Sequence, residues 1–153
     1  MSDILVEQVT APSSEIEDAV RRLLPQLSSS APPFTAQTLE MILGSTASRL
    51  LVARIEGRIV GMLTLVIFPL PSGIRAWIED VVVDDTVRGK GVGEAIARAA
   101  IGVAESAGVR SIDLTSRPTR QGANRLYMRV GFVQRETNVY RYASGARAPG
   151  PAA

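Results

Sequence analysis

The 153-residue sequence contains neither cysteine nor histidine. Without cysteine, disulfide bonds, thiolate metal sites and cysteine nucleophiles are excluded, and a cytoplasmic location is compatible with the sequence. Without histidine, the most common general base and the most common metal ligand are missing. Any acid–base chemistry must therefore use Glu, Asp, Tyr, Lys or water.

Long apolar runs and an excess of one charge are also lacking. The apolar runs are far shorter than the roughly 20 residues of a membrane span, and residues 1–10, with Asp3 and Glu7, do not resemble a signal peptide. Lys and Arg number 17 against 15 Asp and Glu, so the net charge is only +2. This near balance does not indicate a nucleic-acid-binding surface, although the pI is about 9.5. We expect a soluble cytoplasmic protein with no nucleic-acid or membrane partner and no metal.

The hydrophobic content of 46% is sufficient for one domain with a sizeable core. We expect this single domain to span residues 1–142. Residues 143–153 are rich in Gly, Pro and Ala and lack large apolar side chains, so we expect a disordered tail there.

Apolar periodicity predicts a mixed α/β layer in which consecutive strands precede a strand–loop–helix unit. We expect a hairpin turn at Glu56-Gly57 and a further turn at Pro69–Gly73. The expected strands are Ile4–Val9, Arg49–Ile55, Arg58–Phe68, Ile74–Val83, Ser111–Ser116, Phe132–Arg135 and Thr137–Tyr142.

Helical spacing and capping residues predict four helices. The first begins at a capping box of Ser14 and Glu17 and stops at Pro25, and the second runs from a Thr35 cap to Gly44. The third, Glu94–Ala107, ends at Gly108, and the fourth covers about Gln121–Val130. We expect the third helix to pack closely on the sheet, because the side chains of its buried stripe are mostly small. This stripe consists of Val92, Ile96, Ala99, Ala100, Val103 and Ala107.

The segment Arg88-Gly89-Lys90-Gly91-Val92-Gly93-Glu94 connects a strand to a helix and carries a glycine at every second position. Glycines allow a ligand to approach the backbone closely. The start of the helix adds N–H groups without intrahelical partners and a partial positive charge, which together favour an anion. Arg88 and Lys90 have the matching sign. We therefore expect this loop to bind a phosphate or pyrophosphate group.

Several interpretations of this loop compete. A Walker-type loop requires a Lys-Ser or Lys-Thr pair, which does not follow these glycines, and the dinucleotide fingerprint requires a G-x-G-x-x-G spacing followed by βαβ units. A simple connecting turn is the plainest alternative. The remaining pattern, Arg88-x-x-Gly91-x-Gly93, resembles the R/Q-x-x-G-x-G/A pyrophosphate loop of the GNAT superfamily of acyl-CoA-dependent N-acyltransferases.

A second signature follows about thirty residues later. The segment from Ala123 through Tyr127 to Phe132 resembles the A-x-x-L/F-Y-x-x-x-G-F motif of the same superfamily, in the family's order and spacing. The resemblance extends over nearly the whole chain. It implies a central mixed, mostly antiparallel sheet in which the parallel strands at 77–83 and 111–116 splay apart. The pantetheine arm of acyl-CoA would lie in that cleft, bonded to the backbone edge of residues 81–83 (Val81, Val82 and Val83).

The resemblance also implies roles for individual side chains. Tyr127 would donate a proton to the leaving thiolate, and a phenol with a pKa of about 10 suits a thiolate of about 8.5. Ala123, one turn earlier, would leave room for the arm. Glu79 is the candidate base, on the strand face that we expect it to share with Trp77, Val81 and Val83, and Asp80 on the other face is the alternate. A core tyrosine and an ordinary surface glutamate remain the plain alternatives, and the oxyanion donor would be a backbone N–H near Val81 or Val82.

One position departs from the family pattern. Many members carry an asparagine seven residues before the tyrosine, where this chain has Arg120. An arginine could reach a phosphate, an acidic acceptor or solvent, as could Arg117, and Asn124 is the nearest amide that could contact the arm. The resemblance implies a direct-transfer N-acetyltransferase that uses acetyl-CoA and acts on a primary amine of a small molecule or protein. The alternative function is a non-catalytic acyl-CoA-binding sensor or scaffold.

The acceptor amine cannot be identified from the sequence. The expected walls of its site are residues 28–38 and Pro69–Gly73, and neither carries a pattern that indicates a substrate. Composition alone favours a plain surface connection for residues 28–38. Family members are often homodimers, but no pattern in this sequence indicates an oligomeric state.

Overall fold

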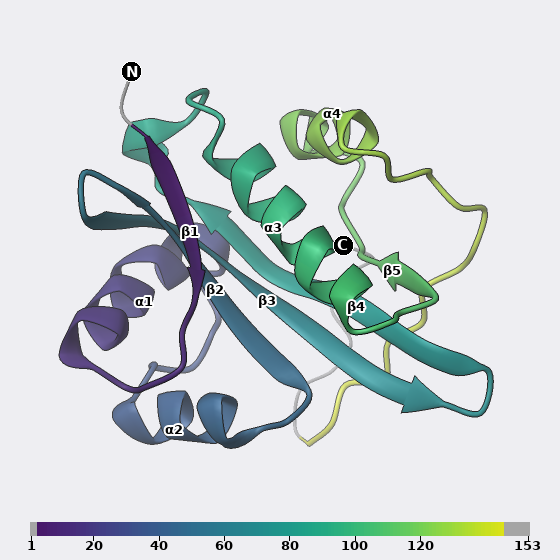
Figure 1. Cartoon of the computed structure of the whole chain (residues 1–153), viewed down its shortest axis with the longest axis horizontal. Helices are drawn as coiled ribbons and strands as arrows, with labels where there is room; N and C mark the ends of the chain where they lie inside the picture. Colours follow the sequence, from purple (N-terminus) through teal and green to yellow (C-terminus); the bar gives the residue numbers. More distant parts are fainter. Residues whose placement is uncertain (1–2, 146–153) are drawn as a thin grey trace. The chain divides into compact units, whose positions relative to one another are not determined.

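The computed structural model describes residues 3–145 and divides into two compact units, residues 1–114 and 115–153. The first unit contains a five-stranded sheet with order β1-β2-β3-β4-β5 and three of the α-helices (Figure 1). The fourth lies in the second unit. The predicted mixed sheet and the four predicted α-helices are therefore confirmed. Within the described residues, no helix is both long enough and apolar enough to span a bilayer.

Four of the strands form an antiparallel meander, and the fifth pairs in parallel with its end. The strands are β1 (Ile4–Gln8), β2 (Ser48–Ile55), β3 (Arg58–Leu70), β4 (Gly73–Val83) and β5 (Ser111–Asp113). β5 has only three residues, whereas the sequence predicted a strand over 111–116. Its ladder with β4 is correspondingly short, from Arg75 opposite Ser111 to Trp77 opposite Asp113.

The two hairpin turns differ in how well the sequence predicted them. Glu56 and Gly57 have φ angles of 49° and 82°, which is the conformation of the two-residue turn that suits strand twist, so the predicted hairpin is confirmed. The second turn is shorter than predicted, because only residues 71 and 72 lie outside the strands. Pro69 pairs opposite Ile74 near the end of β3, where a missing N–H costs at most one ladder bond.

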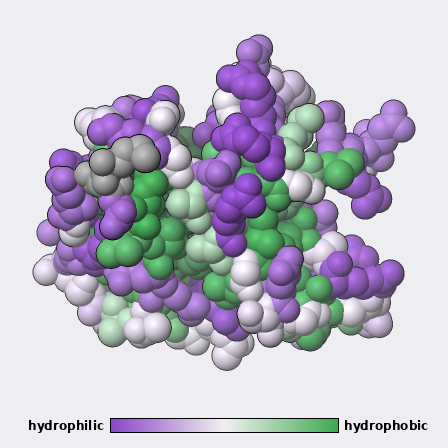
Figure 2. Space-filling model, turned by 45° about the horizontal axis from the view of Figure 1, so that its top comes forward, coloured by the Kyte–Doolittle hydropathy of each residue, from purple (hydrophilic) through white to green (hydrophobic). Residues whose placement is uncertain are grey.

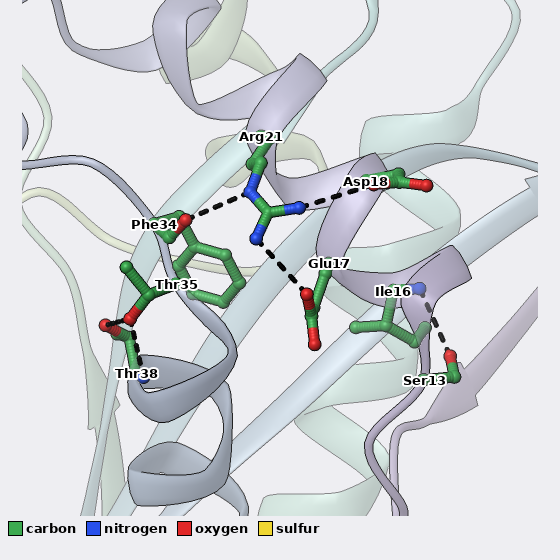
Figure 3. Close-up of polar contacts among 8 residues, drawn as sticks. All are labelled: Ser13, Ile16, Glu17, Asp18, Arg21, Phe34, Thr35 and Thr38. Atoms are coloured by element: carbon green, nitrogen blue, oxygen red, sulfur yellow. Dashed lines mark hydrogen bonds and ion pairs between the residues drawn. The ribbon is translucent and has the colours of Figure 1, made fainter.

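The first helix, α1 (Ser14–Leu27), departs from the prediction at both ends. Its cap is Ser13 rather than Ser14: the Ser13 hydroxyl accepts from the Ile16 N–H at 3.2 Å (Figure 3). Glu17 is then one residue too late for a capping box. The helix also continues through Pro25, because a proline in the last turn removes a single intrahelical hydrogen bond without preventing the next residues from following.

The second helix, α2 (Ala36–Gly44), begins as predicted, with the Thr35 hydroxyl accepting from the Thr38 N–H at 3.2 Å. Arg21 joins α1 to the connection before this cap. Its Nε donates to the Phe34 carbonyl oxygen at 3.0 Å, while its other nitrogens contact Glu17 and Asp18 on the same helix (Figure 3). The segment before α2 is thus fastened at its end by a side chain of α1.

Helices cover both faces of the sheet. α1 and α2 lie on one face, and α3 (Val92–Ser106) lies on the other (Figure 1). The core against α1 and α2 consists of Val9, Ile16, Ala19, Val20, Leu23, Leu39, Leu50, Val52, Ile59, Met62 and Val82. The alternate residues of the strands, such as Leu51, Leu63 and Ile78, are buried towards α3.

The buried stripe of α3 differs in part from the prediction. The buried residues are Val92, Ile96, Ala97, Ala100 and Ala104, whereas Ala99, Val103 and Ala107 are only half-buried. The helix is thus rotated about its own axis from the predicted orientation, by less than the angle between consecutive residues. Small side chains nevertheless dominate the stripe, as expected. Gly108, at φ 77°, follows the last helical turn in the left-handed conformation that a glycine adopts most readily.

The second unit contains α4 (Gln121–Arg129), as predicted, but not the two predicted strands at 132–135 and 137–142. Their β-prone side chains, including Val133, Val139 and Tyr140, are exposed instead. The face of the molecule drawn in Figure 2 carries both polar and apolar patches. A strand requires a hydrogen-bonded partner, and no ladder in the described residues includes this segment. The predicted disordered tail at 143–153 falls mostly outside the described residues.

Candidate functional site

The most unusual backbone feature of the first unit is a bulge in β4. Asp80 has φ 51° within the strand, and the β3–β4 register shifts so that Glu79 is opposite Thr64 while Val82 is opposite Met62. Leu63 therefore faces two residues of β4, which is the definition of a β-bulge. Asp is one of the few non-glycine residues that tolerate this conformation.

The bulge corrects the prediction that Trp77, Glu79, Val81 and Val83 share one face of the sheet. Residues opposite each other in a ladder lie on the same face, so Glu79 lies with Thr64, and Val82 lies with Met62 towards α1 and α2. Val83 pairs with Gly61, on the face of α3. One extra residue reverses the alternation downstream of it. Of the three valines predicted to bind the coenzyme arm, only Val82 is fully buried.

The parallel ladder ends before the bulge. β5 pairs with β4 only as far as Trp77, and β4 then continues for six residues, through Glu79 and the bulge to Val83. In the described part of the first unit, these last residues of β4 are not paired with β5. The backbone of Val81–Val83 therefore extends past the parallel partner, which is the arrangement that a strand-like ligand arm requires.

Glu79 is exposed, but its carboxylate has a defined partner. The indole Nε1 of Trp77 donates to the Glu79 Oε1 at 2.7 Å. Trp77 is the single tryptophan of the chain and is half-buried. This hydrogen bond holds the Glu79 carboxylate beside Trp77, where the ladder between β4 and β5 ends. Asp80, the alternate base, is also exposed, at the bulge itself.

A short segment that contains the glycine loop joins β4 to α3. After a single 3-10 turn, η1 (Asp85–Val87), the exposed residues Arg88, Gly89 and Lys90 lead to Gly91, the residue that precedes α3. Gly89 and Gly91 have φ angles of 79° and 85°, which other residues adopt only under strain. A β-carbon at Gly89 would meet no atom within 4 Å, so the loop keeps its backbone open on that side.

The start of α3 combines a buried side chain with accessible backbone. The first helical hydrogen bond runs from the Ala95 N–H to the Gly91 carbonyl oxygen, so the N–H groups of Val92 and Gly93 precede the intrahelical pattern. The Val92 side chain is 1% exposed and packs the start of α3 against the sheet. Glu94 Oε2 lies 3.7 Å from Arg98 Nε on the same helix. Arg88 contacts the Asp85 carboxylate at 2.6 Å, and both side chains are exposed.

The remaining predicted site residues gather on α4 in the second unit. Arg120 precedes the helix and supplies no side-chain cap, while the Asn124 amide donates to the Arg117 carbonyl oxygen at 3.0 Å. Ala123 and Tyr127 are both half-buried and one turn apart. The amide of Asn124 thus already serves to fix the turn before α4.

Tyr127 is held by its local surroundings. Its ring meets that of Phe132 edge-to-face, with centroids 5.9 Å apart, and its carbonyl oxygen accepts from the Phe132 N–H at 2.9 Å. Burial raises the pKa of the Tyr127 hydroxyl, and the positive charge of Arg120 opposes this in part. The phenol therefore remains protonated at neutral pH, as a proton donor must.

The structure thus brings the predicted residues together in two groups. Glu79, the edge residues 81–83 and the glycine loop lie in one continuous segment of the first unit. The other group consists of Arg120, which precedes α4, and of Ala123, Asn124 and Tyr127 on that helix. Sequence reasoning missed two features: the bulge at Asp80, and the hydrogen bonds that join Arg22 and Gln26 of α1 to Asp84 and Asp85. The Asp84-x-Thr86 pattern, in which an aspartate accepts from the backbone N–H two residues later, was a local signal that Asp84 has a structural role.

In the described residues no group of three or more Asp or Glu is arranged to hold a metal ion. The end of β4 that β5 does not pair, the glycine loop and the start of α3 also lie within the range matched by a known protein family. The family model described as acetyltransferase (GNAT) family matches residues 15–132. The chain belongs to this family. The match covers the glycine loop and the Tyr127 motif.

Solved structures of acetyltransferases share the fold. An acetyltransferase of Trypanosoma brucei is 27% identical, with a TM-score of 0.75, and the match covers 92% of this chain and 100% of that one. An aminoglycoside N-acetyltransferase, AAC(6')-Iy, in complex with CoA is 19% identical, with a TM-score of 0.77 and coverage of 94% and 96%. Glucosamine-6-phosphate N-acetyltransferase from Arabidopsis thaliana is 21% identical, with a TM-score of 0.76 and coverage of 92% and 98%. A search of curated proteins finds no match.

Proposed function

We propose that this GNAT protein transfers an acetyl group from acetyl-CoA directly to a primary amine of a small molecule or protein. The observation that carries the proposal is the continuous segment in which β4 extends past β5, passes through a bulge and enters a glycine loop at the start of α3. Family membership supports the class of reaction, and this segment has features that suit the diphosphate, the pantetheine arm and the thioester of the donor.

The loop has the properties that a diphosphate requires. Gly89 and Gly91 adopt positive φ angles, the N–H groups at the start of α3 point out of the helix, and Arg88 and Lys90 add positive charge. A β-carbon at Gly91 would lie 3.9 Å from Ile4 Cδ1, which is an ordinary contact, and one at Gly89 would meet no atom within 4 Å. The positive φ angles, and not crowding, therefore favour glycine at these two positions. These residues fit the phosphate groups of coenzyme A.

The edge of β4 fits the pantetheine arm and the reacting carbonyl. Val81 and Val83 carry backbone groups beyond the end of the β5 ladder, and an amide-bearing arm could pair with them as a short strand does. The N–H of Val81 or Val82 would stabilise negative charge on the thioester oxygen as the amine attacks.

The proton transfers are assigned to two side chains. A C–N bond forms between the neutral amine and the acetyl carbon, and the C–S bond breaks. The amine loses a proton to Glu79, directly or through water, with Asp80 as the alternate, and the departing thiolate gains one from Tyr127. The Trp77 hydrogen bond to Glu79 and the raised pKa of Tyr127 support these assignments.

The test is a thiol-release assay with acetyl-CoA and a panel of amines. The panel contains aminoglycosides and glucosamine-6-phosphate, the acceptors named for two structural neighbours, together with amino acids and peptides that offer lysine and N-terminal amines. We expect free thiol to appear with at least one class of amine. If acetyl-CoA binds but no amine is acetylated, the protein is an acyl-CoA sensor or scaffold and the proposed activity is wrong.

A further inference from the structure

The residue at the junction of β4 and the glycine loop is a buried charge. Asp84 is 3% exposed, and within the described range 3–145 no other charged or polar residue is buried to this degree. A buried carboxylate is stable only where hydrogen bonds and opposite charges replace its water. Its partners therefore show what the fold requires at this position.

Both carboxylate oxygens of Asp84 are occupied. Oδ2 accepts from Arg22 Nη1 at 2.7 Å, and Oδ1 accepts from the backbone N–H of Thr86 at 3.1 Å and from its hydroxyl at 3.0 Å. The Thr86 N–H, the Thr86 hydroxyl and the charges of Arg22 and Arg58 together lower the pKa of Asp84. The carboxylate is thus charged at neutral pH and fixes the first turn of the loop to α1.

Two further contacts extend this connection. Arg22 also donates to the Ile59 carbonyl oxygen at 2.8 Å, so it bridges β3 and the end of β4. One turn later on α1, the side-chain oxygen of Gln26 accepts from the Asp85 N–H at 2.9 Å. Two side chains of one helix therefore hold Asp84 and Asp85, the first two residues after β4, from which η1 leads into the glycine loop.

We propose that Arg22 and Asp84 are positioning residues for the coenzyme's diphosphate: they fix the near end of the glycine loop, while Val92 in the core fixes its far end. A loop with glycines at 89 and 91 has many accessible conformations, and ordering it at the moment of binding would cost affinity. Fastening both ends beforehand removes part of that cost. The inference rests on the proposed function, because it assumes that the loop binds the diphosphate.

The experiment compares two donors that differ at the phosphate end. Acetyl-CoA and S-acetylpantetheine are titrated calorimetrically into the wild type, Arg22→Met and Asp84→Asn. The matched control is Arg58→Met, since Arg58 is 3.9 Å from the same carboxylate and its side chain is 62% exposed. We expect at least a tenfold loss of affinity for acetyl-CoA in the first two variants. Affinity for S-acetylpantetheine, and both affinities of the control, should stay within about twofold of wild type.

A general structural role would give a different result. If Arg22→Met and Asp84→Asn weaken both donors by the same factor, or leave acetyl-CoA binding unchanged, the proposal is overturned. Gln26→Ala, which removes only the bond to the Asp85 N–H, decides the question if the other two variants do not fold. We expect it to weaken acetyl-CoA about threefold and S-acetylpantetheine not at all, and an unchanged affinity for acetyl-CoA would contradict the proposal.

Failure of this inference and failure of the proposed function are distinguishable. A wild-type protein that binds and consumes acetyl-CoA, with variants that do the same at equal affinity, refutes the positioning role alone. A wild-type protein that does not bind acetyl-CoA refutes both.

Discussion

The contact between Gly61 of β3 and Val92, the first residue of α3, allows a quantitative prediction. A β-carbon at Gly61 would lie 3.0 Å from Val92 Cγ1, 3.4 Å from the Val82 carbonyl oxygen and 3.6 Å from Ala53 Cβ. Carbon atoms in contact normally stay about 3.5–4.0 Å apart. Gly61→Ala should therefore force Val92, and with it the end of the glycine loop, away from the sheet.

The expected magnitude follows from two opposing terms. Overpacking of a core typically costs about 1–3 kcal/mol, while replacing glycine by alanine restricts the unfolded chain and returns about 0.4–1 kcal/mol. Gly61→Ala should therefore lower the free energy of unfolding by about 1–2 kcal/mol. Val92→Ala alone should cost about 2–3 kcal/mol, since it removes two buried methyl groups and leaves a cavity.

The double variant separates this explanation from a general intolerance of alanine at position 61. With alanine at 92, the 3.0 Å contact with Val92 Cγ1 is removed and only the ordinary contacts with the Val82 carbonyl oxygen and Ala53 Cβ remain, so Gly61→Ala should become neutral or stabilising. The coupling should be about 1–2 kcal/mol. Urea denaturation, followed through the fluorescence of Trp77 as the single tryptophan, measures each free energy. Equal cost of Gly61→Ala in both backgrounds would refute the reasoning.

Three further predictions concern the proposed site. Tyr127→Phe should lower kcat about 10²- to 10⁴-fold with little change in the Kd of acetyl-CoA, and an equal loss of both would indicate a packing role. Glu79→Gln should lower kcat about 10²-fold or more, and Trp77→Phe should lower kcat by a smaller factor. Combined with Glu79→Gln, Trp77→Phe should lower kcat no further, because it acts through its hydrogen bond to Glu79. If the two substitutions lower kcat independently, the hydrogen-bonded pair does not have this role. Because the pKa of Asp84 is lowered, its contribution to stability is full above the unfolded value near 3.9 and declines as pH falls through the folded value. The free energy of unfolding of Asp84→Asn should therefore be about 2 kcal/mol below that of the wild type at pH 7. In urea titrations this difference should narrow below about pH 4. If it is the same at every pH, the charge of Asp84 does not contribute to stability.

Features with local causes were predictable from the sequence. The Glu56-Gly57 turn follows from residues that accept positive φ, and the Thr35 cap follows from a hydroxyl within reach of the N–H three residues on. The glycine loop was located for the same reason, although α3 begins at Val92, two residues before the predicted start at Glu94. The family motifs placed Tyr127 on a helix, which the structure confirms.

Features that depend on distant partners were not predictable. The bulge at Asp80 exists because β3 and β4 contribute unequal numbers of residues between their paired positions. The sequence of neither strand alone indicates this difference. The ion pair of Arg22 with Asp84 joins residues 62 positions apart. The strands predicted at 132–142 failed for a related reason: β-prone side chains form a strand only where a partner edge is available.

The central claim is that the glycine loop binds the diphosphate of coenzyme A, and amide resonances measure this most directly. ¹⁵N-labelled protein is titrated with coenzyme A and, separately, with pantetheine. Coenzyme A should shift the amides of Gly89, Gly91 and Gly93 most strongly, and pantetheine should leave these three unchanged while shifting those of residues 81–83. If coenzyme A leaves the three glycine amides unshifted, the account is wrong.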